Sequence, residues 1–351
     1  MNRLGKLTLL TIINQLILLG LNPVLAQFFN THQLGEFRYY YSLLSFLAII
    51  CTLSFDKVIY TVEYRKKITA IVCVLFVTFF LSFLIAIYSF YSNNYFLLLM
   101  SLCIIPYSMF YLLIAFNASE NSYANIYKIK VIDTLFNPSI KLFVAFFRFE
   151  PLFLFLGELI SKFLVFIVFI KLHIKIKNKE SYTFSAVLAF LSESKSYLKF
   201  VYPGVLLNAF SLLLPVLVLK FYYSYAEVGL YALAFSITQA PSGLINNNIS
   251  TILQSDFKSN NFIAGFTGIV CKLFSVYLLY PMFVYLNSNY FVESFFNSDW
   301  QGLSDIMFPI AILTSFVGVT NPFSVYFHLL NKERELFLFQ FFKFSTRLAF
   351  L

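Results

Sequence analysis

Five polar residues recur at helical spacing within an apolar stretch of this 351-residue chain. Between residues 125 and 147, the spacing of Lys130, Asp133, Thr134, Asn137 and Lys141 places them on one helical face. Charged groups are costly in apolar surroundings, so they usually pair with one another or face a cavity. Such a face can bind an anion through lysine, or a proton or cation through aspartate. The alternative is a buried structural pairing of these charges that does not line a cavity.

The next apolar stretch, residues 152–173, carries Glu158 and Lys162. Lys141 is six residues from the end of its stretch and Glu158 is six residues into the next. On antiparallel helices both therefore lie about 9 Å from the same end. Two pairings are open. Lys141 can pair with Glu158, which leaves Lys162 freer, or Glu158 can pair with Lys162 at i, i+4.

Two further regions hold polar groups within apolar sequence. Lys272 lies about as deep as Lys162, and two cations at one depth suit an anionic group such as a pyrophosphate. Snorkelling toward an interface is the alternative for Lys272 and for Arg38. The stretch 228–253 contains Gln239-Ala-Pro-Ser-Gly243 followed by Asn246-Asn247-Asn248. It predicts either a polar lining or a helix kink packed on its neighbours.

The elements that position these residues are membrane-spanning helices. The chain is 60% hydrophobic and 12% charged, with a mean hydropathy of +0.80. Ile68 to Phe90 is free of charge and follows a basic triplet, and a helix of that length crosses a bilayer. We expect an all-α polytopic membrane protein with about 11 (10–12) spans: 7–29, 38–60, 68–90, 95–116, 125–147, 152–173, 200–221, 228–253, 263–286, 305–330 and an incomplete 336–351.

Basic residues divide between the two ends of these spans. With the N-terminus in the cytoplasm, 17 of the 25 Lys and Arg lie at cytoplasmic ends. The opposite ends hold Arg38, Arg148 and Lys220, and the predicted outer loop Asn287 to Ser304 has neither Lys nor Arg. This pattern predicts a cytoplasmic N-terminus. The net charge of +9 therefore fits a membrane face better than nucleic acid. The 47 Phe and the many Asn and Lys suggest an AT-rich, bacterial genome.

The sequence also shows signs of duplication. LNPVLAQFF at 21–29 resembles LLPVLVLKF at 213–221, and Gly35-Glu-Phe37 resembles Gly229-Leu-Tyr231, at offsets of 192 and 194. Chance similarity between apolar stretches is the alternative. The duplication predicts two six-helix-type repeats around a central cavity. The predicted halves are 1–174 and 200–351, joined by a basic cytoplasmic linker at 175–199.

These stretches carry a family resemblance. PVLAQFFNTHQLGEFRYYYSLLSFLAIICTLSFDKVIYTVEYRKK and PVLVLKFYYSYAEVGLYALAFSITQAPSGLINNNIS resemble spans one and two, and seven and eight, of the bacterial polysaccharide (O-antigen) flippases. These belong to the multidrug, oligosaccharidyl-lipid and polysaccharide exporter superfamily. Its members usually have twelve or more spans, whereas this chain ends within an eleventh, which leaves a truncated sequence or a short product as alternatives.

The resemblance implies a transporter rather than an enzyme. It would move an undecaprenyl-pyrophosphate-linked oligosaccharide, an O-antigen or capsule repeat unit, by alternating access. Membrane lipids are expected around it, with a polysaccharide polymerase and a chain-length regulator as partners. Two alternatives remain: a multidrug or cation antiporter of the same superfamily, and a membrane polysaccharide polymerase or ligase. The antiporter would be expected to carry unpaired acidic residues in its cavity. The polymerase or ligase would usually carry a large periplasmic loop with Arg or His.

The chain lacks the signatures of soluble catalysis. Its three histidines are scattered, no Gly-rich phosphate loop is present, and the four cysteines have no metal-ligand spacing, so we expect no cofactor and no metal. The predicted site residues fall into two groups. The substrate-binding residues are Lys162, Lys272, Lys141, Arg38, Asn137 and Asn247. The ion-coupling residues are Asp133 and Glu158.

Overall fold

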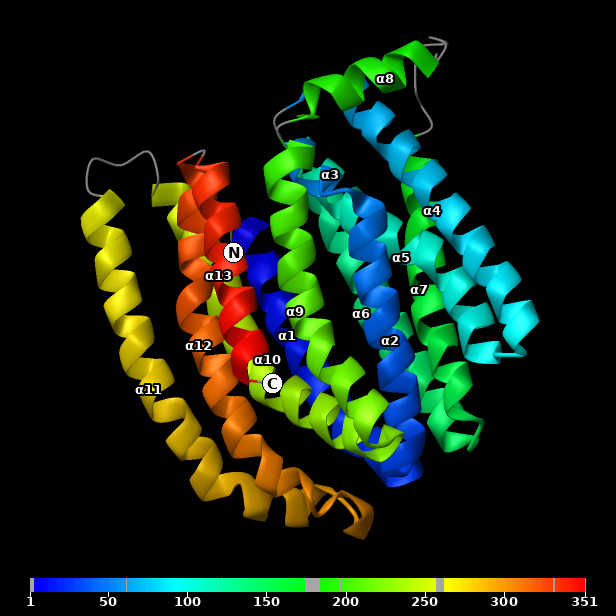
Figure 1. The fold of residues 1–351 in the computed structure, drawn as a ribbon, viewed down its shortest axis with the longest axis vertical. Coiled ribbons are helices and arrows are strands. Elements are labelled where there is room, and N and C mark those ends of the chain that lie inside the picture. Colours follow the sequence, from blue (N-terminus) through cyan, green and yellow to red (C-terminus); the bar gives the residue numbers. More distant parts are fainter. Residues whose placement is uncertain are drawn as a thin grey trace. The chain divides into compact units, whose positions relative to one another are not determined.

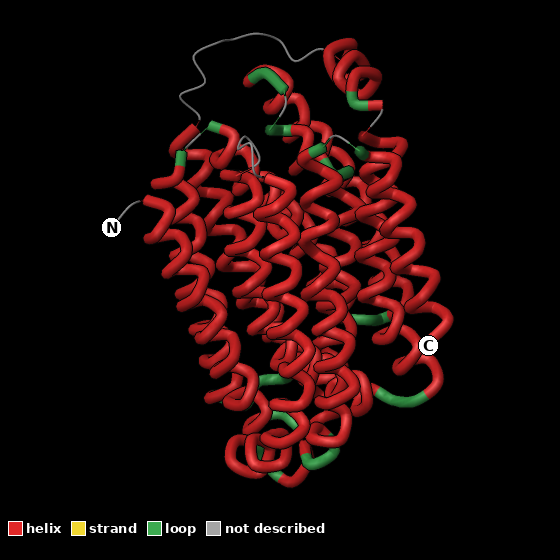
Figure 2. Tube along the Cα trace, turned by 90° about the vertical axis from the view of Figure 1, so that its left-hand side faces the viewer, coloured by secondary structure: helices red, strands yellow, loops and turns green. Residues whose placement is uncertain are grey.

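The computed structural model describes residues 3–60, 62–120, 122–173, 184–195, 197–256, 262–330 and 332–350, and nearly all of this part is helical (Figures 1 and 2). The α-helices are α1 (Arg3–Phe28), α2 (Thr31–Thr52), α3 (Phe55–Val58), α4 (Tyr64–Ser92), α5 (Tyr95–Ser119), α6 (Tyr123–Phe146), α7 (Phe155–His173), α8 (Phe184–Glu193), α9 (Tyr202–Tyr222), α10 (Tyr225–Asp256), α11 (Phe262–Phe295), α12 (Leu303–Leu329) and α13 (Glu333–Phe350). Three single turns complete them: η1 (Pro151–Leu154), η2 (Tyr197–Val201) and η3 (Ser298–Trp300).

Each of the eleven predicted spans overlaps a long helix, and the described part of this polytopic membrane protein is helical throughout its spans. Within the described residues, six segments are long and apolar enough to cross a bilayer: Lys66–Ser92, Tyr95–Ser119, Pro151–Phe169, Tyr197–Tyr222, Val270–Phe295 and Leu303–Thr320. A continuous helix satisfies its own backbone hydrogen bonds, which hydrocarbon requires. The remaining long helices carry more polar residues.

Three details differ from the sequence-based expectation. The second span does not continue to residue 60, because Leu53 and Ser54 take left-handed backbone conformations and end α2 at Thr52. The predicted outer loop Asn287 to Ser304 is mostly helical, since α11 continues to Phe295 and η3 and α12 follow closely. The linker 175–199 contains α8, an apolar helix of ten residues.

The chain forms two compact units. Unit 1 comprises Met1–Arg38 and Val216–Phe339, and unit 2 comprises Tyr39–Pro215 and Gln340–Leu351. The chain passes between them within α2, α9 and α13. These units do not coincide with the two sequence halves, because α1 and the start of α2 pack with α10 to α12. The boundaries at 174 and 200 stay a prediction about the duplication.

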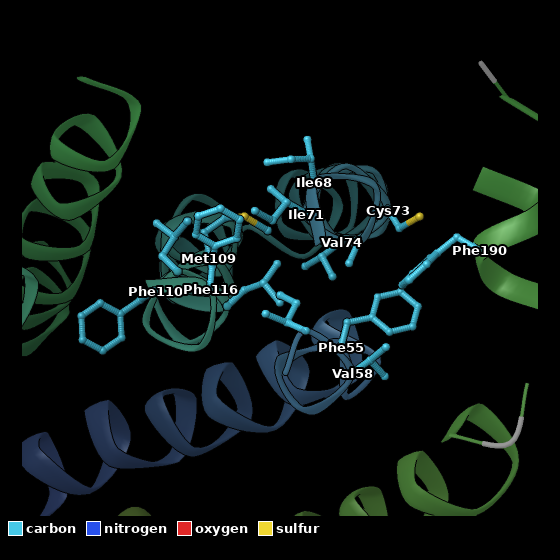
Figure 3. Close-up of a cluster of buried hydrophobic side chains, with 14 of the residues drawn as sticks. Phe55, Val58, Ile68, Ile71, Cys73, Val74, Met109, Phe110, Phe116 and Phe190 are labelled. Atoms are coloured by element: carbon cyan, nitrogen blue, oxygen red, sulfur yellow. The ribbon is translucent and has the colours of Figure 1, made fainter. Parts of the chain in front are cut away.

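Unit 2 is built around an apolar cluster on α3, α4 and α5 (Figure 3). Phe55 of α3 is fully buried and contacts the ring of Phe190 from α8, with ring centroids 5.1 Å apart. Lys66 of α4 adds an ion pair to Glu193 of α8 at 2.5 Å. These contacts hold α8 across the end of α4 (Figure 1).

In unit 1 the two sequence-related helical hairpins meet at their turns. Helix α1 ends at Phe28 and α9 ends at Tyr222, and the following helices begin at Thr31 and Tyr225, so both boundaries are shifted by 194 residues. A Cβ on Gly35 would overlap the Tyr225 carbonyl oxygen, and a Cβ on Gly229 would overlap the Thr31 carbonyl oxygen. The two glycines therefore make a reciprocal contact that leaves no room for a side chain.

Candidate functional site

A close approach of α6 and α7 in unit 2 creates the polar site. A Cβ on Gly157 of α7 would lie 3.0 Å from the Asn137 carbonyl oxygen and 3.0 Å from Cγ of Lys141, both on α6. The missing side chain therefore lets the two helices approach at Asn137 and Lys141. Glu158 follows Gly157 directly, so the same approach brings its carboxylate to Lys141.

Four charged side chains meet at this crossing, and we call them the charge cluster: Asp133, Lys141, Glu158 and Lys162. Lys141 Nζ lies 2.5 Å from Glu158 Oε1, and Lys162 Nζ lies 3.1 Å from Glu158 Oε2. Lys162 Nζ also lies 2.5 Å from Asp133 Oδ1. The predicted Lys141–Glu158 pair is confirmed. The alternative pairing of Glu158 with Lys162 is present as well.

Burial and charge balance define what the charge cluster can do. The Glu158 side chain is 2% exposed, whereas that of Asp133 is 18% exposed. Two lysines and two carboxylates sum to zero charge when all four are ionised. The expectation that pairing of Lys141 would leave Lys162 freer was wrong, because Asp133 and Glu158 both contact Lys162. Asp133 is the member most accessible to a proton or a small cation.

Tyrosine rings lie next to the charge cluster, and their hydroxyl groups contact one another. Lys141 Nζ lies 5.6 Å from the ring centroid of Tyr41, and Lys162 Nζ lies 5.6 Å from that of Tyr107. The Tyr41 and Tyr107 hydroxyl oxygens are 3.1 Å apart, and Tyr111 donates to Tyr107 at 3.4 Å. These tyrosines are not among the residues predicted from the sequence, although Tyr107 and Tyr111 share one face of their helix at i, i+4.

The other predicted site residues lie elsewhere. Asn137 is buried in unit 2 against Gly157. Arg38 belongs to unit 1 and donates to Asn22 Oδ1 at 2.5 Å. Lys272 also belongs to unit 1, where it is an exposed residue on α11. Asn247 falls in the part of α10 whose side chains lie outside the described residues. Binding of one anion by both Lys162 and Lys272 therefore stays a prediction.

Within the described part of the chain, no group of three His, Cys, Asp or Glu side chains is placed to hold a metal ion.

Comparison with known proteins gives a match by structure and none by sequence. No family model matches the chain, and no curated protein matches it. A solved structure of the lipid II flippase MurJ, in an inward closed conformation, superposes with a TM-score of 0.70. The match covers 95% of this chain and 77% of that one, at 15% sequence identity. The chain therefore has the fold of this solved flippase.

Proposed function

We propose that the protein is a flippase for a lipid-linked oligosaccharide, an undecaprenyl-pyrophosphate-linked O-antigen or capsule repeat unit. The observation that carries the proposal is the fold shared with the lipid II flippase over 95% of the chain. The chemistry is compatible with it. Buried polar groups inside the helical bundle can accommodate a phosphorylated sugar head while the lipid tail stays in the bilayer.

Within this proposal, the charge cluster is the candidate coupling site. A proton or cation on Asp133 would weaken its pair with Lys162 and change the net charge of the cluster from zero to positive. An anionic substrate would then find a cation inside unit 2. Asp133 and Glu158 thus keep their proposed coupling role, and Lys141 and Lys162 contribute to binding through that change of charge.

The neutrality of the charge cluster also bears on the rival multidrug exporter. An excess of intramembrane lysine would argue against a cationic substrate. Lys141 and Lys162 do not contribute to such an excess, because Asp133 and Glu158 offset their charges.

A polymerase and a chain-length regulator remain proposed partners in a surface-polysaccharide pathway.

Reconstitution tests the proposal. Purified protein in vesicles is expected to move a fluorescently labelled undecaprenyl-diphosphate disaccharide from the inner leaflet to the outer one. A membrane-impermeant quencher then reports the label that becomes accessible. A labelled phosphatidylcholine in the same vesicles is the control and should not move. Transport of a cationic dye with no movement of the lipid-linked sugar would replace the flippase with the drug exporter.

The proposed orientation places the N-terminus in the cytoplasm of a bacterial inner membrane. Reporter fusions at Lys179 and Asn297 should then lie on opposite sides, with Lys179 cytoplasmic, because the basic residues concentrate around the first site and avoid the second. Paired fluorescent-protein and alkaline-phosphatase fusions measure the side directly. The same side for both fusions would contradict this topology.

A further inference from the structure

The end of α2 holds two adjacent residues in a strained backbone conformation. Leu53 and Ser54 have φ angles of 50° and 57°, in the left-handed region that side-chain-bearing residues adopt at a cost. In the described part of the chain, the other non-glycine residues with positive φ are Asn93 and Arg148, which occur singly between helices. Leu53 and Ser54 instead interrupt a stretch, residues 38–60, that the sequence predicts as one span. Backbone strain is therefore stored at a break within an apolar segment.

Local interactions do not explain this break. The Ser54 hydroxyl is buried, meets no hydrogen-bond partner in the described part of the chain, and does not cap α3. A buried hydroxyl without a partner costs free energy. Helix α3 has four residues, too few to form a stable helix by itself. Contacts with other helices must therefore hold the chain in this shape.

These contacts come from α9 and α8. The Tyr202 hydroxyl of α9 donates to the carbonyl oxygen of Ile50, in the last turn of α2, at 3.1 Å. In a continuous helix the same carbonyl would accept from the backbone N–H of Ser54. On the other side of the break, Phe55 is fully buried and faces the ring of Phe190 from α8 (Figure 3). Tertiary contacts thus oppose the strain of the backbone.

We propose that residues 53–54 are a switch point between this bent form of α2 and a straight form, in which α2 and α3 join into one helix. Leu53 and Ser54 then take ordinary helical angles, which releases their strain. Residues 53–60 are apolar except for Asp56, Lys57 and Ser54, so the longer helix suits the edge of a bilayer. Straightening withdraws Phe55 from Phe190, and therefore couples the shape of α2 to the docking of α8.

A distance between two spin labels distinguishes the two forms. Labels at Leu43→Cys and Tyr60→Cys are introduced together with Cys271→Ser, because Cys271 is an exposed free thiol. In a continuous helix the two labelled Cα atoms are about 26 Å apart, and the bend brings them closer. Pulsed electron paramagnetic resonance of the protein in lipid nanodiscs is expected to show both distances. A single, shorter distance that no substitution at Ser54 changes would overturn the switch.

Substitution of Ser54 shifts the balance in a defined direction. Ser54→Gly and Ser54→Ala both remove the buried hydroxyl, but only glycine adopts the left-handed conformation without strain. Ser54→Gly should therefore lower the ratio of straight to bent form about fivefold or more relative to Ser54→Ala, its matched control. Equal ratios in the two variants would mean that strain at this position does not set the balance, which contradicts the proposal.

Hydrogen exchange gives a second measurement on protein without labels, so the test does not depend on the folding of the cysteine variants. Because the straight form frees Phe190, the amides of α8 should exchange about fivefold or more slowly in Ser54→Gly than in Ser54→Ala. Equal exchange in α8 would overturn the coupling between the two helices. Neither measurement involves a substrate, so the switch is tested independently of flipping in vesicles.

Discussion

Replacing Glu158 with Gln is expected to lower the free energy of unfolding by about 3–5 kcal/mol, because removing one partner of a buried ion pair leaves an uncompensated charge. Glu158 faces both Lys141 and Lys162, so its loss leaves only Asp133 to offset two lysines. The fraction of folded protein after heating, measured by size-exclusion chromatography in detergent, checks this expectation.

Glu293→Gln is the matched control, since Glu293 is exposed on α11, and a change there should cost less than about 0.5 kcal/mol. A charge swap, Lys141→Glu with Glu158→Lys, should fold better than either single change. Its recovery is expected to be partial, because the new lysine at 158 would face Lys162. Equal stability of Glu158→Gln and Glu293→Gln would mean that the charge cluster does not hold α6 and α7 together.

Gly35→Ala is expected to destabilise the protein by about 3 kcal/mol or more, at the upper end of overpacking effects. The added methyl would overlap the Tyr225 carbonyl oxygen and lie 2.8 Å from the Gly229 nitrogen. Both neighbours are backbone atoms, so α2 and α10 must separate rather than a side chain rotating away. Gly229→Ala should behave in the same way, and thermal unfolding measured by intrinsic fluorescence reports both.

Gly20→Ala provides the comparison. A Cβ at Gly20 meets no atom within 4 Å, and alanine favours a helix by up to about 1 kcal/mol over glycine. This variant should be neutral or slightly stabilised. If Gly35→Ala unfolded at the same temperature as Gly20→Ala, the two hairpins would not be packed at their turns as described.

The sequence could place Lys141 and Glu158 at the same depth, but it left open whether Glu158 pairs with Lys141 or with Lys162. Helical rise is constant, and neighbouring antiparallel spans share an end, so counting residues from that end places both groups. The spans could also be predicted, because the length and hydropathy of a segment are read directly from its residues. These quantities do not require knowledge of how each helix is rotated about its axis.

The contacts that depend on helix rotation and close approach could not be predicted in this way. Lys162 meets Asp133 because of the way α6 and α7 face each other, and the role of Gly157 emerges only from the atoms that a Cβ there would meet. The sequence showed Gly35 and Gly229 as a repeated pattern but gave no sign that they touch. Helix α8 was not predicted, because its ten residues are too few to span a membrane.

The reciprocal contact of Gly35 and Gly229 has a consequence for how this chain can change over time. Equivalent residues that touch each other reciprocally are related by a local two-fold axis, the geometry of an isologous interface in a symmetric dimer. Here both sides are encoded in one gene. An insertion or a larger residue in one hairpin turn would shift that axis for the other, so we expect a change in one turn to require a matching change in the other.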